Sequence, residues 1–261
     1  MSTTKLQYSN SVYQTAAKKI SLLSKTFPAF SFYSKFLAII FRASQKAKRG
    51  KYDNFAWCKS SFAVLRSLEK KGVSFEISGI NFIEQLEEPC VIIGNHMSML
   101  ETVVLPIIIQ PIRDVTFIVK QPLLDYPVFK HVMRSRDPIA VTRTNPRQDL
   151  KTVMEGGIDR LSRGISIIVF PQTTRTRQFD PSHFSSIGVK LAQKANAPIV
   201  PLVLKTDAWG NGKRLKDFGK IDPAKKVYFA FGEPMRVKRR GNEEHQAIID
   251  FIQKKLQEWG E

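Results

Sequence analysis

From Val73 to Trp259, short apolar runs alternate with longer segments that have a helical pattern. Runs with the length and composition of buried strands lie at residues 73–77, 90–93, 115–119, 138–142, 165–170, 199–204 and 227–231. One helical pattern begins near Met99, and three others cover residues 147–162, 186–195 and 243–259. Such alternation is typical of proteins in which helices connect parallel strands and cover the sheet. The sequence therefore predicts an α/β fold with a mostly parallel central sheet flanked by helices.

Three polar segments follow predicted strands: the residues around His96, Arg143, and residues 171–175. In a parallel sheet the carboxyl ends of the strands meet at one edge, and ligands bind there. We therefore expect these three segments to lie close together.

The charge of the chain is concentrated near its start. The 261 residues carry a net charge of +18, and residues 1–71 contain 14 Lys or Arg against 2 Asp or Glu. A basic segment of this kind indicates an anionic partner, either a nucleic acid or a membrane surface with anionic lipids. No nucleic-acid recognition module is evident, which favours the membrane. We predict a basic amphipathic helical segment over residues 1–71 and an α/β domain over residues 72–261.

Residues 27–41 (FPAFSFYSKFLAIIF) are rich in Phe, Leu and Ile, and residues 42–51 are basic. Interfacial helices use this combination. The alternative is a surface helix that packs its apolar stripe on the main domain. No run of 18 apolar residues and no cleavable signal peptide is evident, and the two cysteines fit a reducing compartment. We expect a peripheral or monotopic protein at the cytoplasmic face of a membrane.

His96 and Glu101 are the first candidate catalytic pair. An imidazole can take a proton from a substrate hydroxyl while a carboxylate orients the ring and stabilises its charged form. A competing interpretation is structural, because Ser98 and Glu101 fit the S-x-x-E capping box of a helix start. The four histidines have no metal-ligand spacing, so no metal site is expected.

The segment Phe170-Pro171-Gln172-Thr173-Thr174-Arg175 is the first candidate anion site. Turn N–H groups, threonine hydroxyls and a guanidinium can together hold a phosphate. Arg143, at the end of the predicted strand 138–142, is a second candidate. Taken by itself, the segment 170–175 is better explained as an ordinary polar turn. Arg143 alone could equally be a solvated charge at a strand end, which is common in a basic protein.

Taken together and in this order, the segments resemble the PlsC-like family of glycerolipid acyltransferases, also known as lysophosphatidic acid acyltransferases. Asn95 to Glu101 matches the N-H-x-x-x-x-D block, and residues 170–175 match F-P-E-G-T-R. Arg143 matches the strand-ending arginine block, Val200-Pro201 matches a V-P block, and Lys120 matches a lysine block. The resemblance covers roughly residues 75–235.

This resemblance implies transfer of a fatty acyl group from coenzyme A or acyl carrier protein to the hydroxyl of a lysophospholipid such as 1-acyl-glycerol-3-phosphate, in phospholipid biosynthesis. His96 and Glu101 would be catalytic, no cofactor would be needed, and a membrane lipid would be the acceptor. Substrate binding would fall to Lys120, Arg143, Gln172, Thr173, Thr174 and Arg175.

The sequence departs from the family pattern at two places. Glu101 replaces Asp, and Gln172-Thr173 replaces Glu-Gly. These departures leave open another lysolipid head group or a catalytically inactive protein, and the charge leaves open a nucleic-acid-binding protein.

Overall fold

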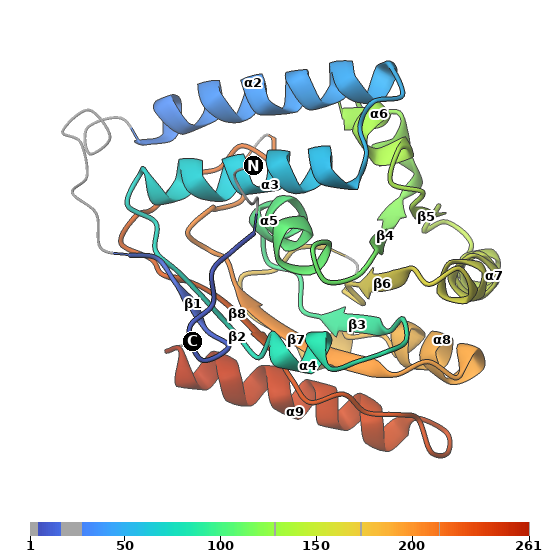
Figure 1. Cartoon of the computed structure of the whole chain (residues 1–261). Helices are drawn as coiled ribbons and strands as arrows, with labels where there is room; N and C mark the ends of the chain where they lie inside the picture. The colour runs from blue at the N-terminus through green and yellow to red at the C-terminus, as the bar shows by residue number, and fades with distance from the viewer. Residues whose placement is uncertain (1–4, 17–27, 128, 173, 214, 261) are drawn as a thin grey trace.

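The computed structural model describes residues 5–16, 28–127, 129–172, 174–213 and 215–260 (Figure 1). Its strands are β1 (Tyr13–Gln14), β2 (Phe75–Ser78), β3 (Val91–Gly94), β4 (Val115–Lys120), β5 (Ile139–Val141), β6 (Ser166–Val169), β7 (Ile199–Lys205) and β8 (Val227–Phe231). Its α-helices are α2 (Pro28–Lys48), α3 (Asn54–Glu69), α4 (Asn81–Glu84), α5 (Leu100–Ile109), α6 (Phe129–Arg134), α7 (Pro146–Ser162), α8 (Ile187–Ala195) and α9 (Asn242–Glu258).

The strands form one sheet in the order β1-β2-β8-β7-β3-β6-β4-β5. The block from β7 to β5 is parallel throughout, and β8 joins it in the antiparallel sense, as does β1 on β2. The predicted α/β fold with a mostly parallel sheet is confirmed. Because β3 to β7 all point the same way, the segments that follow them meet at one edge of the sheet.

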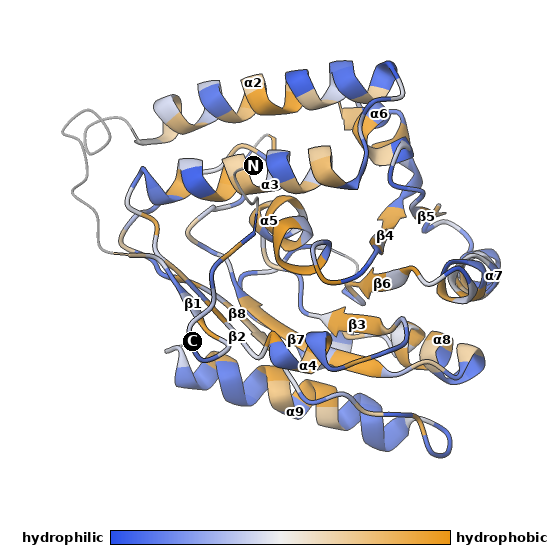
Figure 2. Ribbon diagram, in the orientation of Figure 1, coloured by the Kyte–Doolittle hydropathy of each residue, from blue (hydrophilic) through white to orange (hydrophobic). Residues whose placement is uncertain are grey.

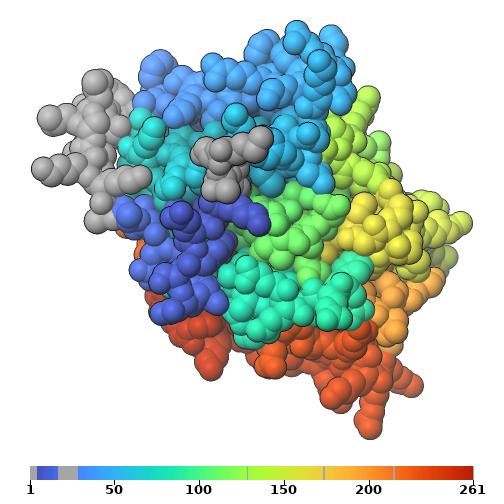
Figure 3. Space-filling model, viewed as in Figure 1, coloured from blue at the N-terminus to red at the C-terminus, as the bar shows by residue number. Residues whose placement is uncertain are grey.

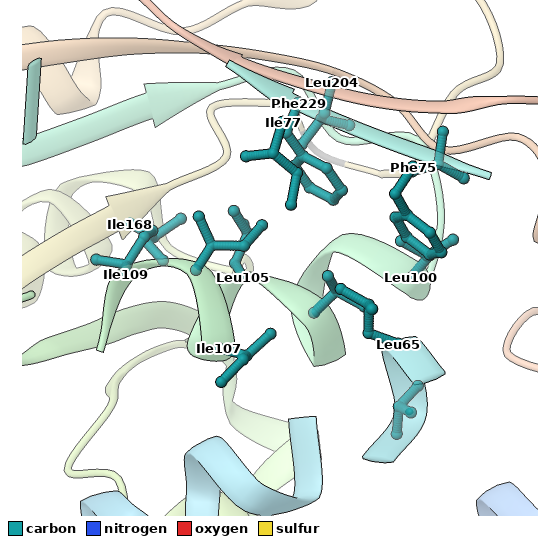
Figure 4. Packing of buried hydrophobic residues seen from close by; sticks show 14 of the residues in the cluster. Leu65, Phe75, Ile77, Leu100, Leu105, Ile107, Ile109, Ile168, Leu204 and Phe229 are labelled. Carbon is teal, nitrogen blue, oxygen red and sulfur yellow. The ribbon is translucent and has the colours of Figure 1, made fainter. Parts of the chain in front are cut away.

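Helices cover both faces of the sheet. Alternate strand residues such as Ile92, Ile168 and Leu204 pack with α2, α3 and α5, while Val91 and Ile93 pack with α7, α8 and α9. Strands buried on both faces need apolar residues at every position, which explains the continuous apolar runs, visible as the orange colour of β3 and β7 in Figure 2. Figure 4 shows side chains of α5 between α3 and the strands.

The helix α5 continues through Pro106, although a proline inside a helix removes one backbone hydrogen bond and can kink or end the helix. The hydroxyl of Ser61 in α3 supplies hydrogen bonds to backbone groups of α5 next to this proline. It donates to the carbonyl oxygen of Val103 at 2.7 Å and accepts from the N–H of Ile107 at 3.0 Å. The hydroxyl therefore bridges a carbonyl and an N–H group of α5 that an undisturbed helix would bond to each other, and it joins α3 to α5.

The N-terminal segment is helical as predicted at α2 and α3, but it also contains the short strand β1. The side chains of Tyr13 and Thr15 donate to the buried carboxylate of Glu69 in α3, at 2.5 and 2.8 Å. These bonds fasten β1 beside β2. Phe32 and Phe36 of α2 are fully buried in the core that the sheet also lines. The boundary between residues 71 and 72 stays a prediction.

Figure 3 shows α2 along the upper surface of the molecule. Among the helices of the described residues, none is both long enough and apolar enough to cross a bilayer.

Candidate functional site

The candidate site lies at the edge where the parallel strands end. His96 follows β3, Lys120 ends β4, Arg143 follows β5, and residues 170–176 follow β6. The end of β3 is held by the side chain of Asn95, which exchanges hydrogen bonds of 2.8 and 2.9 Å with the backbone of Leu204 in β7. This amide continues the strand pairing by one residue and fixes where His96 begins. The expectation that these segments lie together is confirmed.

His96 and Glu101 are in direct contact, with 2.9 Å between Nδ1 and Oε1. The Glu101 side chain is fully buried, whereas 15% of the His96 side chain is exposed. A carboxylate can only accept a hydrogen bond, so Nδ1 carries the proton in this contact. The other ring nitrogen, Nε2, is then an acceptor.

Four further donors converge on the Glu101 carboxylate. The backbone N–H groups of Met97 and Ser98 donate to Oε1, both at 2.7 Å. The hydroxyls of Ser98 and Thr206 donate to Oε2, at 2.9 and 2.6 Å. Burial alone would raise the pKa of Glu101, but the hydrogen bonds from His96, Thr206 and Ser98 outweigh it and lower the pKa below the ordinary 4.5. The carboxylate is therefore ionised at neutral pH.

The two interpretations of Glu101 describe the same carboxylate. Its bond to the N–H of Ser98 is the contact that a capping box makes at a helix start, just before α5 begins at Leu100. Its bond to His96 orients the imidazole. The side chain supports the helix start and the ring together.

His96 is also held from the other side by residues 170–176. Its ring stacks on Phe170, with 4.5 Å between centroids and 7° between planes. Its backbone N–H donates to the Gln172 side-chain oxygen at 2.6 Å, and its carbonyl accepts from the Thr176 N–H at 3.0 Å. The backbone N–H and the carbonyl of His96 are therefore both held by hydrogen bonds.

Gln172 lies behind His96 and is only 3% exposed. Its side-chain N–H group donates to the Thr176 hydroxyl at 2.6 Å, so both ends of the amide bond within the protein. Thr173, another predicted substrate-binding residue, lies outside the described residues. Thr174 is exposed and lines the cavity described next.

A cavity of about 330 Å³ opens beside His96. Its walls are mostly apolar and come from α2, α3, β4 and α6. A row of ring contacts runs from His96 through Phe170 and Phe117 to Trp57. Trp57 in turn packs against the guanidinium of Arg136.

Cations gather around the same cavity: Lys120, Arg143, Arg175 and Lys216 all line it. Partial burial lowers the pKa of Lys120, and the charges of Arg143, Lys216 and Arg175 lower it further. Arg175 is paired with Asp217 at 2.7 Å.

The turn that carries Arg143 is held in an unusual conformation. Arg143 has a φ of +63°, a region that side-chain-bearing residues adopt rarely. Asp149 of α7 stabilises the turn by accepting the N–H groups of Thr142 and Arg143, at 2.8 and 2.6 Å.

Sequence reasoning missed four residues of this site. Thr206 follows β7 and could have been suspected from its position at the end of a predicted strand. Phe170 lay within a recognised block, but nothing in the sequence indicated its stacking. Lys216 and Asp217 come from the long connection between β7 and β8, where the sequence has no motif.

Comparison with known proteins identifies the family to which a chain with this site belongs. The family model described as Acyltransferase matches residues 74–205, half of the chain. A 1-acyl-sn-glycerol-3-phosphate acyltransferase of Pseudomonas aeruginosa is 32% identical over 146 residues, which are 56% of this chain and 54% of that protein. A probable enzyme of the same name from Mycoplasma genitalium is 30% identical over 138 residues, 51% of each chain. The chain thus spans about half the length of the curated relatives that it matches.

The fold has a solved counterpart. The crystal structure of the 1-acyl-sn-glycerophosphate acyltransferase PlsC from Thermotoga maritima superposes with a TM-score of 0.64 at 18% identity. The match covers 90% of this chain and 96% of that one. At this identity the likeness concerns the fold, and the family follows from the sequence model. The chain therefore belongs to the acyltransferase family, as one of its PlsC-like members.

Proposed function

We propose that the protein transfers a fatty acyl group from an acyl thioester to the free hydroxyl of a lysophospholipid such as 1-acyl-glycerol-3-phosphate. One observation carries the proposal: the buried Glu101 carboxylate orients His96 at a cavity that combines apolar walls with a group of cations. A lysophospholipid has the matching parts, namely an acyl chain, a phosphate and a hydroxyl between them. The names of the curated relatives support the same acceptor.

In this mechanism His96 is the general base. Its Nε2 takes the proton of the acceptor hydroxyl while the oxygen attacks the thioester carbonyl carbon. The tetrahedral intermediate collapses, the carbon–sulfur bond breaks, and the imidazolium returns the proton to the leaving thiolate. Glu101 stabilises the imidazolium throughout, because its carboxylate is ionised and bonded to Nδ1.

The acyl group passes directly to the acceptor without an acyl-enzyme. The two cysteine thiols are buried, and burial raises the pKa of Cys58 to about 11 and that of Cys90 as well. Thiols kept neutral in this way are poor nucleophiles. We assign no step to a metal or a cofactor; coenzyme A or acyl carrier protein enters as the carrier of the acyl group.

Phosphate binding is proposed for Lys120, Arg143, Thr174 and Arg175, which line the cavity beside His96. Gln172 is better assigned to positioning His96, because its amide bonds to the His96 backbone and to Thr176. Under this assignment the replacement of Glu by Gln does not change the acceptor.

We further propose peripheral attachment to the cytoplasmic face of a membrane through α2. Phe30, Leu37 and Phe41 of α2 are 80%, 48% and 57% exposed, and Lys46 and Lys48 lie in its last turn. Exposed apolar side chains next to lysines are characteristic of surfaces that insert into anionic bilayers.

The decisive experiment supplies labelled acyl-CoA and acyl carrier protein thioesters to the protein together with a panel of lysolipids. We expect transfer to lysophosphatidate, and we expect His96→Ala to reduce kcat by ~10²–10⁴-fold while circular dichroism stays unchanged. A His96→Ala protein with near-wild-type transfer would refute the assignment of the base. Wild-type protein that acylates none of the acceptors with either donor would refute the function itself.

A further inference from the structure

Residues 206–213 and 215–226, which lie between β7 and β8, form a closed lobe beside the site. Trp209 and Ile221 pair as an antiparallel bridge, and the N–H of Gly210 donates to the carbonyl of Lys220 at 2.9 Å. The segments around Gly210 and Gly219 approach each other closely: a Cβ atom on Gly219 would lie 1.7 Å from the carbonyl oxygen of Gly210. Only glycine fits such an approach, so the lobe has a defined shape.

The lobe rests on α2 through aromatic contacts. Trp209 is fully buried, and its ring meets Phe32 and Phe36 edge to face at centroid distances of 4.8 and 5.0 Å. Its indole N–H donates to the carbonyl oxygen of Asp217 at 3.1 Å, and the Tyr33 hydroxyl donates to the carbonyl of Gly219. These bonds hold the part of the lobe that carries residues 216 and 217.

Both of these residues reach the residues that follow β6. The Asp217 carboxylate pairs with the Arg175 guanidinium at 2.7 Å, and the Lys216 ammonium lies 3.3 Å from the Thr174 hydroxyl. Both side chains line the cavity beside His96. The pairing uses one of the five N–H groups of Arg175, so others remain for a ligand.

We propose that Lys216 determines acceptor specificity by binding the phosphomonoester of the lysolipid, and that Asp217 is a positioning residue that holds Arg175 toward it. This inference rests on the proposed function. A phosphomonoester carries about −1.5 to −2 charges at neutral pH. Lys120, Arg143, Arg175 and Lys216, together with the Asp217 carboxylate, complement that charge. A neutral acceptor gains nothing from Lys216, and a choline head group adds a positive charge.

The test compares Lys216→Met with Lys213→Met, a control at an exposed lysine of the same lobe that lies outside the cavity lining. For Lys216→Met we expect KM for lysophosphatidate to rise about tenfold, with kcat within about twofold, and KM for monoacylglycerol to stay unchanged. Lys216→Arg should restore the lysophosphatidate KM, and Lys213→Met should resemble the wild type. Asp217→Asn should raise the same KM without lowering kcat.

An unchanged lysophosphatidate KM in Lys216→Met, or equal increases for both acceptors, would overturn the inference and leave the proposed function intact. If the wild type transfers to no acceptor, the proposed function fails, and calorimetric titration with glycerol 3-phosphate then decides about Lys216 alone. Weaker binding by Lys216→Met than by Lys213→Met would support the inference; equal binding would end it.

Discussion

The Glu101 carboxylate combines a structural contact and a proposed catalytic contact on one side chain. Glu101→Gln keeps an oxygen that can accept from Met97, Ser98 and His96, but it removes the charge that stabilises the imidazolium. We expect kcat to fall by ~10²–10⁴-fold and the free energy of unfolding by only about 1–3 kcal/mol. The rate of thiol release measures kcat, and unfolding in denaturant measures the free energy of unfolding. An active but less stable variant would mean that Glu101 serves the helix start alone.

The stability effect of Glu101 also depends on pH. Its pKa is lower in the folded protein than the ordinary 4.5, so folding favours the ionised form. The stabilisation is therefore complete above the ordinary pKa and is lost as the pH falls through the lowered one. We expect the difference in unfolding free energy between the wild type and Glu101→Gln to be constant near neutral pH and to shrink below pH 4.5. A difference that stays constant down to pH 3 would contradict this.

Gln172 differs from the family residue, and its proposed positioning role can be tested directly. In Gln172→Glu the carboxylate can still accept from the His96 N–H and can accept from the Thr176 hydroxyl, but it adds a buried negative charge near the imidazole. A negative charge favours a nearby cation, so the acid limb of the kcat/KM profile should move to higher pH.

The ratio of KM values for lysophosphatidate and lysophosphatidylcholine provides the control for Gln172→Glu. Positioning of His96 predicts an unchanged ratio. A shifted ratio with an unchanged pH profile would show instead that Gln172 contacts the acceptor.

Among the secondary-structure elements, the strands of the parallel block were the easiest to predict. β3 and β6 are buried at all four positions, and apart from Gly94 and Ser166 their side chains are apolar, so the runs are visible in the sequence. The strand β1 and the helix α6 were missed for a physical reason. β1 has two residues and depends on Glu69, 55 positions after its last residue Gln14, while α6 has six residues and takes its place from packing against α2.

The contact between α3 and α5 depends on one hydroxyl. Ser61→Ala leaves the carbonyl of Val103 and the N–H of Ile107 buried without the Ser61 bridge, since Pro106 disturbs this part of α5. Each such group costs ~1–3 kcal/mol, so for the two groups we expect the free energy of unfolding in urea to fall by ~2–6 kcal/mol. Ser60→Ala is the matched control, because Ser60 bonds to Ala56 within its own helix, and it should change stability by less than ~1 kcal/mol. Equal effects would show that the Ser61 bridge does not stabilise α5.

For the molecule as a whole, the position of the site was predictable and its surroundings were not. The strand-ending positions of His96 and Arg143 follow from the topology, because parallel strands end at one edge. The role of Thr206, in contrast, depends on β7 lying beside β3, and that of Asp217 on a lobe that rests on α2. Thr206 lies 105 positions from Glu101, and Asp217 lies 42 positions from Arg175. Contacts over such separations carry no local pattern, so only the folded chain reveals them.

The proposed attachment to a membrane depends on the outer surface of α2. Its inner side chains are buried, so exchanging the exposed Phe30 and Phe41 for serine should leave the core unchanged. Full burial of one such ring contributes ~1.5–3 kcal/mol, and partial insertion of two should therefore account for a roughly 30-fold change in partitioning. We expect Phe30→Ser with Phe41→Ser to lower binding to vesicles containing phosphatidylglycerol by that factor in a flotation assay.

Leu150→Ser, at a half-exposed position of α7 on the other side of the sheet, is the control and should bind like the wild type. Transfer to a short-chain lysophosphatidate below its micelle concentration should be equal for all three proteins. Equal vesicle binding by the double variant would contradict attachment through α2, and α2 would then be only a cover for the cavity.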